Sequence, residues 1–120
     1  MPKQFRMLVV DDEIDFLGII AQDLEEMGVV VYTASNGIDA ENFILNHGNI
    51  DVVLCDVRMP GKSGIDVLRT VRENDKTKDL RFILMSGYPN SFEKLDPNLR
   101  ANATIQKPID MSTFNSLIGL

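Results

Sequence analysis

The sequence has 120 residues, the length of one domain around one hydrophobic core, and we expect a single domain over residues 1–120. Its 44% hydrophobic and 25% charged residues exclude a disordered chain. A net charge of −6 argues against direct binding of nucleic acid, because proteins bind the phosphate backbone mainly through Lys and Arg. The N-terminus is not typical of a signal peptide, no apolar run could cross a membrane, and the one cysteine has no disulfide partner. We therefore expect a cytoplasmic protein without membrane contact.

Along the chain, short apolar runs that predict β-strands alternate with segments of helical length. The first run covers residues 7–10 and precedes a predicted helix over residues 14–27, whose apolar side chains recur at helical spacing and which Gly28 caps. Further strands are predicted over 29–32, 52–55, 82–85 and, more weakly, 103–105, and further helices over 38–45 and 65–71. The last helix is expected to begin near Met111, with Asp110 or Ser112 as its cap.

The order of strand and helix, repeated five times, predicts a doubly wound α/β fold. In such a fold the strands are parallel and helices cover both faces of the sheet. Connections between parallel strands are right-handed, which leaves few topologies. Ligands of open parallel sheets bind beyond the carboxyl ends of the strands, where the strand order reverses.

Five polar side chains follow the predicted strands at that edge. They are Asp11 and Asp12 after the first strand, Asp56 after the third, Ser86 after the fourth and Lys107 after the fifth. If the strand order is 2-1-3-4-5, the first and third strands are neighbours and three carboxylates meet. Two carboxylates ~4 Å apart repel by about 4 kcal/mol at an effective dielectric constant of ~20, so this group favours a bound divalent cation. Mg²⁺ fits, because it takes one or two carboxylates together with water and a phosphate.

Asp56 is the best placed nucleophile of this group, since a carboxylate can accept a phosphoryl group when a metal shields the incoming oxygens. Ser86 and Lys107 would hold the other phosphoryl oxygens. Each motif alone has a simpler explanation. Asp11 and Asp12 could cap the first helix, Asp56 and Ser86 could be turn residues, and Lys107 could lie in a surface connection. The occurrence of all five at strand ends in one chain favours the site.

Four motifs, in this order and spacing, resemble those of the receiver domains of two-component response regulators. They are VVDDE at residues 9–13, DVRMPGKSG at 56–64, SG at 86–87 and KP at 107–108. The resemblance covers essentially the whole chain and implies a flavodoxin-like fold with five parallel strands in the order 2-1-3-4-5. It also implies a signalling domain, a monomer or weak homodimer, that accepts a phosphoryl group from a sensor histidine kinase or a histidine phosphotransfer protein. Such a domain catalyses only its own phosphorylation and dephosphorylation, and its conformational switch controls a partner or an output domain.

The resemblance further implies a Mg²⁺ site. Asp56 looks like the phosphoacceptor and also like a direct metal ligand. The other direct ligands would be Asp12 and the backbone carbonyl of Arg58, with Asp11 acting largely through water.

The last two motifs resemble the groups that act on the phosphoryl oxygens. Ser86 is similar to the family's hydroxyl residue and Lys107 to its lysine, and the Lys107–Pro108 peptide is expected to be cis, as in most of the family. One position departs from the pattern: three residues before the lysine the family usually has Tyr or Phe, and this chain has Thr104. The departure affects the switch, in which that ring follows the hydroxyl residue, and Tyr88 could take its place.

The phosphodonor of this family is a histidine on a helical bundle that docks over the first helix. Ile19 falls on the polar side of that predicted helix, and Phe16 lies one turn away at the margin of the apolar face. We expect Phe16, Ile19 and Pro108 to contribute to donor docking, although single exposed apolar residues are common and need no function.

Three other protein classes fit the sequence less well. A Mg²⁺-dependent phosphatase of the haloacid-dehalogenase type needs D-x-D at the first strand, whereas Asp11 and Asp12 are adjacent. A flavin-binding module would place hydroxyls rather than two carboxylates against its phosphate. A phosphorylation-independent receiver-like interaction domain would not need the complete set of carboxylates, hydroxyl and lysine.

Overall fold

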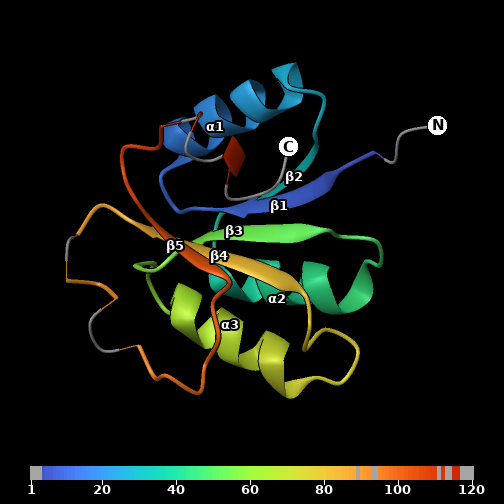
Figure 1. The fold of residues 1–120 in the computed structure, drawn as a ribbon, viewed down its shortest axis with the longest axis vertical. Helices are drawn as coiled ribbons and strands as arrows, with labels where there is room; N and C mark the ends of the chain where they lie inside the picture. Colours follow the sequence, from blue (N-terminus) through green and yellow to red (C-terminus); the bar gives the residue numbers. More distant parts are fainter. Residues whose placement is uncertain (1–3, 89, 93–94, 111, 113–114, 117–120) are drawn as a thin grey trace.

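The computed structural model describes residues 4–88, 90–92, 95–110, 112 and 115–116. Strands and helices alternate along most of this chain (Figure 1). The strands are β1 (Arg6–Val10), β2 (Val30–Ala34), β3 (Val52–Asp56), β4 (Arg81–Ser86) and β5 (Ala103–Gln106). The helices are α1 (Ile14–Glu26), α2 (Gly37–Asn46) and α3 (Gly64–Glu73). All strand pairs are parallel and the sheet order is β2-β1-β3-β4-β5, which confirms the predicted doubly wound α/β fold.

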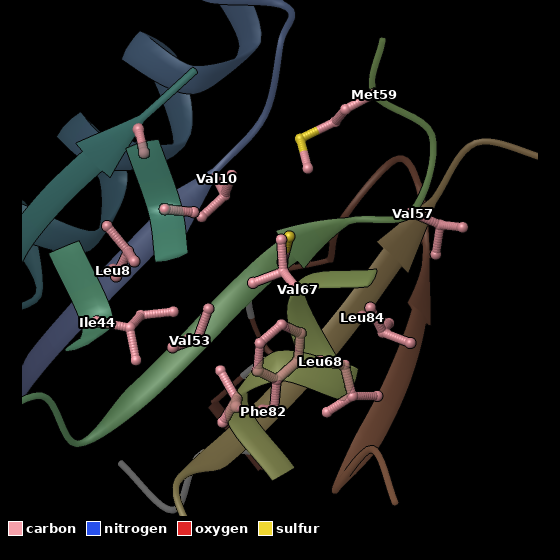
Figure 2. Close-up of a cluster of buried hydrophobic side chains, with 14 residues drawn as sticks. Leu8, Val10, Ile44, Val53, Val57, Met59, Val67, Leu68, Phe82 and Leu84 are labelled. Atoms are coloured by element: carbon pink, nitrogen blue, oxygen red, sulfur yellow. The ribbon is translucent and has the colours of Figure 1, made fainter. Parts of the chain in front are cut away.

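The sheet is covered on both faces because successive side chains of a strand point to opposite sides. On one face, Met7 and Val9 of β1 pack with the apolar side of α1, in particular Leu17 and Leu24. On the other face, Leu8 and Val10 of β1 pack with apolar residues of α2 and α3 (Figure 2). Figure 1 shows α1 on one side of the sheet and α2 and α3 on the other. The central strands β1, β3 and β4 are therefore almost wholly buried, as their continuous apolar sequence predicts.

Local signals set the helix ends close to where the sequence places them. Gly28, the expected cap of α1, has a φ of +89°, a conformation that other residues rarely adopt. The side chain of Asn36 accepts a hydrogen bond from the backbone N–H of Asp39 at the start of α2. Ser63 and Asp66 form a reciprocal capping box at the start of α3. The caps at Asn36 and Ser63 lie at the carboxyl edge of the sheet, where α2 and α3 begin.

The segment between β4 and β5 differs from the predicted repeat. A fourth helix is expected there, but the described residues of this segment contain only turns and bends. The sequence holds Pro89 and Pro97, and a proline removes a backbone donor and disfavours helical geometry in the residue before it. Four partly buried apolar side chains of the segment still pack against the core cluster beneath α2 and α3, namely Phe92, Leu95, Leu99 and Ala101.

The fifth predicted helix falls mostly outside the described residues. Ser112, Asn115 and Ser116 are helical. Asp110 accepts a hydrogen bond from the backbone N–H of Ser112 at 3.0 Å, which confirms it as the capping residue. None of the helices that the structure describes is long and apolar enough to cross a membrane.

Candidate functional site

The five polar residues singled out in the sequence all lie at the carboxyl edge of the sheet. Asp11 directly follows β1, and Asp56 and Ser86 are the last residues of β3 and β4. Lys107 directly follows β5, where its backbone N–H donates to the carbonyl of Ser86 at 2.8 Å. The parallel register brings these strand ends side by side, since Val10 pairs with Cys55 and Asp56 with Met85. The strand order thus assembles the site from residues that are as far apart in sequence as Asp11 and Lys107.

Three carboxylates form the centre of this edge. Asp11, Asp12 and Asp56 each present an oxygen, and these oxygens lie within 4.8 Å of one another. Asp11 is fully buried and Asp56 is only 5% exposed, whereas Asp12 is exposed. Ionised carboxylates at this separation repel one another, and burial makes the repulsion stronger. The cluster therefore needs positive charge to neutralise it.

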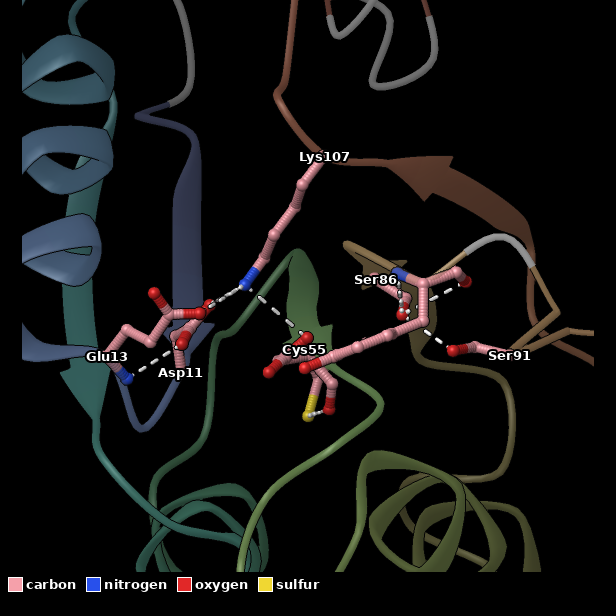
Figure 3. A network of polar contacts seen from close by, with 8 residues as sticks. Asp11, Glu13, Cys55, Ser86, Ser91 and Lys107 are labelled. Carbon is pink, nitrogen blue, oxygen red and sulfur yellow. Dashed lines mark hydrogen bonds and ion pairs between the residues drawn. The ribbon is translucent and has the colours of Figure 1, made fainter.

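Lys107 supplies part of that charge and contacts three acidic side chains (Figure 3). Its Nζ donates to Asp11 Oδ2 at 2.6 Å and lies 3.5 Å from Asp56 Oδ1 and 3.6 Å from Glu13 Oε1. The ring of Phe16 covers the same ammonium group, with 4.4 Å between Nζ and the ring centroid. Burial by itself lowers the pKa of Lys107, but the hydrogen bond to Asp11 and the negative charges around it outweigh burial and raise the pKa. Lys107 is thus held as a cation beside Asp56.

The pKa of Asp56 reflects the excess of negative charge. Burial, followed by the charge of Asp11, raises the pKa of Asp56 to about 6 from an ordinary 3.8, and the contribution of Lys107 in the opposite direction is smaller. Asp56 is therefore mainly ionised at neutral pH, at an energetic cost that a bound cation would remove. The neighbouring Cys55 is fully buried on the α2–α3 face, and burial raises the pKa of its thiol, so it is an apolar core residue.

The β3–α3 loop approaches the backbone of Asp56 closely. A Cβ atom at position 64 would lie 2.1 Å from the carbonyl oxygen of Asp56, so only glycine fits at Gly64. The Gly64 N–H donates to the carbonyl of Val57 at 2.9 Å, and Gly61 has a φ of +78°. The glycines of the DVRMPGKSG motif thus let the loop fold back on the end of β3.

An open depression of about 440 Å³ lies above Asp56. Its lining comprises Asp12, Glu13, Asp56, Arg58, Gly87, Tyr88 and Lys107. The guanidinium of Arg58 lies 4.1 Å from the centroid of the Tyr88 ring, which is 55% exposed. A small anionic group could enter this depression and reach Asp56 and Lys107 together.

The donor set fits Mg²⁺, which prefers oxygen ligands. Asp12 and Asp56 both line the depression, as does Arg58. Both oxygens of Asp11 already have partners, because Oδ1 accepts from the backbone N–H of Glu13 at 2.8 Å and Oδ2 accepts from Lys107. With both oxygens engaged, Asp11 is less free than Asp12 to bind an ion directly, and the role through water that the family resemblance implies stays a prediction.

Ser86 is fully buried, and its hydroxyl bonds to the loop that follows β4 rather than to the carboxylates. Its oxygen accepts from the backbone N–H of Tyr88 at 3.0 Å and lies 2.7 Å from the hydroxyl oxygen of Ser91. The Lys107–Pro108 peptide is cis, as expected. Thr104, which stands where the family usually has Tyr or Phe, is an exposed residue of β5.

The expected docking residues lie in different environments. Ile19 is 62% exposed on α1, and Pro108 is also exposed. Phe16 is half-buried, because its ring packs against the core cluster between α1 and the sheet and against Lys107.

The contacts of Glu13 and Ser91 with the site were not predicted from the sequence. Glu13 pairs with Lys107, and its place in the VVDDE motif could have suggested this contact. The hydrogen bond between Ser86 and Ser91 has no sequence signal, because it depends on how the loop folds.

Curated proteins of similar sequence point to one family. Two uncharacterized response regulatory proteins of Staphylococcus epidermidis are 27% identical to this chain over 125 residues. The alignments cover 97% of the chain and 46% of each relative, so the chain spans about half the length of these relatives.

Solved structures agree in fold. A response regulator receiver domain protein of Clostridium thermocellum has a TM-score of 0.85 at 31% identity, with 96% of this chain and 91% of that chain covered. The response regulator TrrA of Thermotoga maritima, solved in complex with Mg²⁺ and BeF, has a TM-score of 0.85 at 31% identity and 97% coverage of both chains. A response regulator receiver protein of Pseudomonas putida has a TM-score of 0.89 at 25% identity, covering 99% and 98%.

The family model described as the response regulator receiver domain matches residues 7–118, which include the whole carboxylate cluster and the described strands except Arg6, the first residue of β1. The resemblance noted in the sequence is thereby confirmed, and the chain belongs to the response regulator receiver domain family of two-component systems.

Proposed function

We propose that this receiver domain accepts a phosphoryl group on Asp56 in a Mg²⁺-dependent reaction. The observation that carries the proposal is the cluster of Asp11, Asp12 and Asp56, whose oxygens lie within 4.8 Å of one another beside the ammonium group of Lys107. Without a bound cation, the repulsion among these carboxylates would make the cluster energetically unfavourable. The relative TrrA, solved with Mg²⁺ and BeF, supports the same assignment.

Asp56 acts as the nucleophile. With a pKa of about 6 it is mainly ionised at pH 7, so one carboxylate oxygen can attack the phosphorus of the donor. A new O–P bond forms at Asp56, the bond between phosphorus and the donor breaks, and the leaving group takes the bonding electron pair. Lys107 already lies 3.5 Å from Asp56 and can pair with a phosphoryl oxygen. Ser86 can donate its hydroxyl proton to another once that hydroxyl turns toward the site.

Asp12, Asp56 and the backbone carbonyl of Arg58 would hold Mg²⁺, with Asp11 acting through water. When bound, the ion neutralises the phosphoryl oxygens and the carboxylates, which otherwise repel each other. Asp11 holds the Lys107 ammonium group beside Asp56, because its Oδ2 accepts a hydrogen bond from Lys107 Nζ at 2.6 Å.

The donor in this proposal is a sensor histidine kinase or a histidine phosphotransfer protein, in keeping with the family. Residues 1–120 act as one receiver unit, a monomer or weak homodimer, and phosphorylation changes how that unit interacts with a partner or an output domain. Its chemistry is confined to its own Asp56, since receiver domains are regulatory modules rather than enzymes acting on other substrates.

The proposal is tested by mass spectrometry after incubation with acetyl phosphate. We expect the mass of one phosphoryl group to be added in the presence of Mg²⁺, and no adduct with EDTA or in the Asp56→Asn variant. Asp75→Asn is a matched control, because Asp75 is an exposed aspartate of the α3–β4 connection outside the site. An adduct of equal yield in Asp56→Asn would place the phosphoacceptor elsewhere and overturn the proposal.

A further inference from the structure

The hydroxyl of Ser86 is already committed to hydrogen bonds on the β4–β5 connection. A serine hydroxyl has one proton to donate and two lone pairs to accept. One lone pair of Ser86 accepts from the backbone N–H of Tyr88 at 3.0 Å, and the Ser86 and Ser91 hydroxyl oxygens lie 2.7 Å apart. The carbonyl of Tyr88 is 3.5 Å away, at the limit of a hydrogen bond. Among the described residues, Ser86 has no side-chain bond to Asp56 or Lys107.

The contact with Ser91 competes with the function of Ser86. To stabilise an anionic phosphoryl oxygen, Ser86 must donate its only proton to that oxygen. In the present arrangement this proton is directed either to Ser91 or, if Ser91 is the donor, to the distant Tyr88 carbonyl. Figure 3 shows Ser86 and Ser91 turned toward each other, while Lys107 reaches toward Asp11.

We propose that Ser91 is a positioning residue that holds the Ser86 hydroxyl on the β4–β5 connection in the unphosphorylated protein, and that phosphorylation exchanges this hydrogen bond for one to the phosphoryl group. The inference rests on the proposed function of Asp56 and adds a residue to it. In the arrangement in which Ser86 donates its proton to Ser91, this bond is lost when the proton turns to a phosphoryl oxygen, so the bond opposes binding of a phosphoryl group by the amount that it contributes.

The same exchange offers a route from the site to the surface. Ser91 closes a turn, since its N–H donates to the carbonyl of Tyr88 at 3.1 Å, and the next residue, Phe92, packs against the α2–α3 core cluster. Loss of the Ser86 contact therefore frees a turn that is anchored in the core. Thr104 is exposed and has no ring to move, whereas this turn contacts the Ser86 hydroxyl directly.

The test is the affinity for beryllofluoride, a phosphoryl mimic, measured by calorimetry in saturating Mg²⁺. A typical net hydrogen bond corresponds to an about two- to tenfold change in affinity, so Ser91→Ala should bind beryllofluoride about two- to tenfold more tightly than the wild type. Affinity for Mg²⁺ alone should not change, because Ser91 contacts none of the carboxylates. Ser91→Thr keeps the hydroxyl and should restore the affinity of the wild type. Ser35→Ala is the matched control: Ser35 is also half-buried, but it lies on the β2–α2 loop and has no bond to Ser86.

A double variant separates this mechanism from a general effect on the loop. In a Ser86→Ala background, Ser91→Ala should no longer change the affinity, since the hydroxyl on which Ser91 acts is gone. Unchanged or weaker binding by Ser91→Ala alone, or the same gain in the Ser86→Ala background, would overturn the inference. If the wild type binds no beryllofluoride in Mg²⁺, the proposed function of Asp56 fails instead, which distinguishes the two failures.

Discussion

Asp56 is a residue whose position destabilises the fold in the absence of a cation. Its pKa of about 6 in the folded protein exceeds the ordinary value of 3.8, so the folded state binds the proton more tightly than the unfolded state does. Ionisation of Asp56 therefore lowers stability as the pH rises from about 4 to above 6, and protonation restores it. Two pKa units correspond to about 3 kcal/mol, which is an upper bound for this contribution.

We therefore predict that Asp56→Asn is more stable than the wild type at pH 7.5 without Mg²⁺, by up to about 3 kcal/mol. The difference should shrink as the pH falls through about 6 and should nearly vanish near 4, because the wild-type carboxyl is then neutral too. Urea unfolding in EDTA across this pH range measures it. Asp75→Asn, at an exposed position, should show no such trend. A stability difference independent of pH would mean that the charge of Asp56 is not the cause.

The first residue of α3 lies directly against the backbone at the end of β3. Gly64 is the first residue of α3, and a Cβ there would meet the backbone of Asp56. The helix can therefore begin at this place only if the residue has no side chain. Gly18 offers a contrast, since it lies exposed within α1 and a Cβ there would meet nothing within 4 Å.

Opposite effects are expected from the same substitution at the two glycines. Gly18→Ala should stabilise the protein by about 0.5–1 kcal/mol, because alanine loses less backbone entropy than glycine in a helix interior. Gly64→Ala should destabilise it by about 1–3 kcal/mol or more, because the backbone of β3 or α3 has to shift. It should also slow phosphorylation by acetyl phosphate, whereas Gly18→Ala should not. Thermal unfolding and the acetyl phosphate reaction test both, and equal effects at the two positions would contradict the packing argument.

Helix α1 carries exposed apolar side chains next to the site. Ile14 and Ile19 are 63% and 62% exposed, and Phe16 contacts Lys107. Side chains on this surface would lie beside a donor histidine that approaches Asp56. Docking of the donor over α1, which the family resemblance implies, would bring the two reacting groups together through contacts separate from the chemistry.

We predict that Ile19→Asp slows phosphotransfer from the cognate histidine kinase on the order of tenfold or more, as expected for a central residue of an interface. The rate with acetyl phosphate should stay near that of the wild type. Ile38→Asp is the matched control, because Ile38 is 61% exposed but lies on α2. Both rates are followed by the phosphorylated fraction over time. Equal slowing of both reactions by Ile19→Asp would show damage to the fold or the site and would contradict docking at this position.

Features that local chemistry encodes could be predicted from the amino-acid sequence alone. Apolar periodicity predicted the five strands and three of the helices, and Gly28 and Asp110 marked helix ends, because caps depend on neighbouring residues alone. The motif residues were placed at one edge of the sheet because parallel strands share that edge. The strand order itself came from the family resemblance, since periodicity does not say which strands are neighbours.

The contacts among these residues became known from the three-dimensional structure. It showed that Lys107 is shared among Asp11, Glu13 and Asp56, that Phe16 covers it, and that Ser86 bonds to Ser91. It also replaced the expected fourth helix with turns in the described part of the β4–β5 connection. These outcomes depend on long-range packing and on the balance of competing hydrogen bonds and charges, which no local pattern in the sequence specifies.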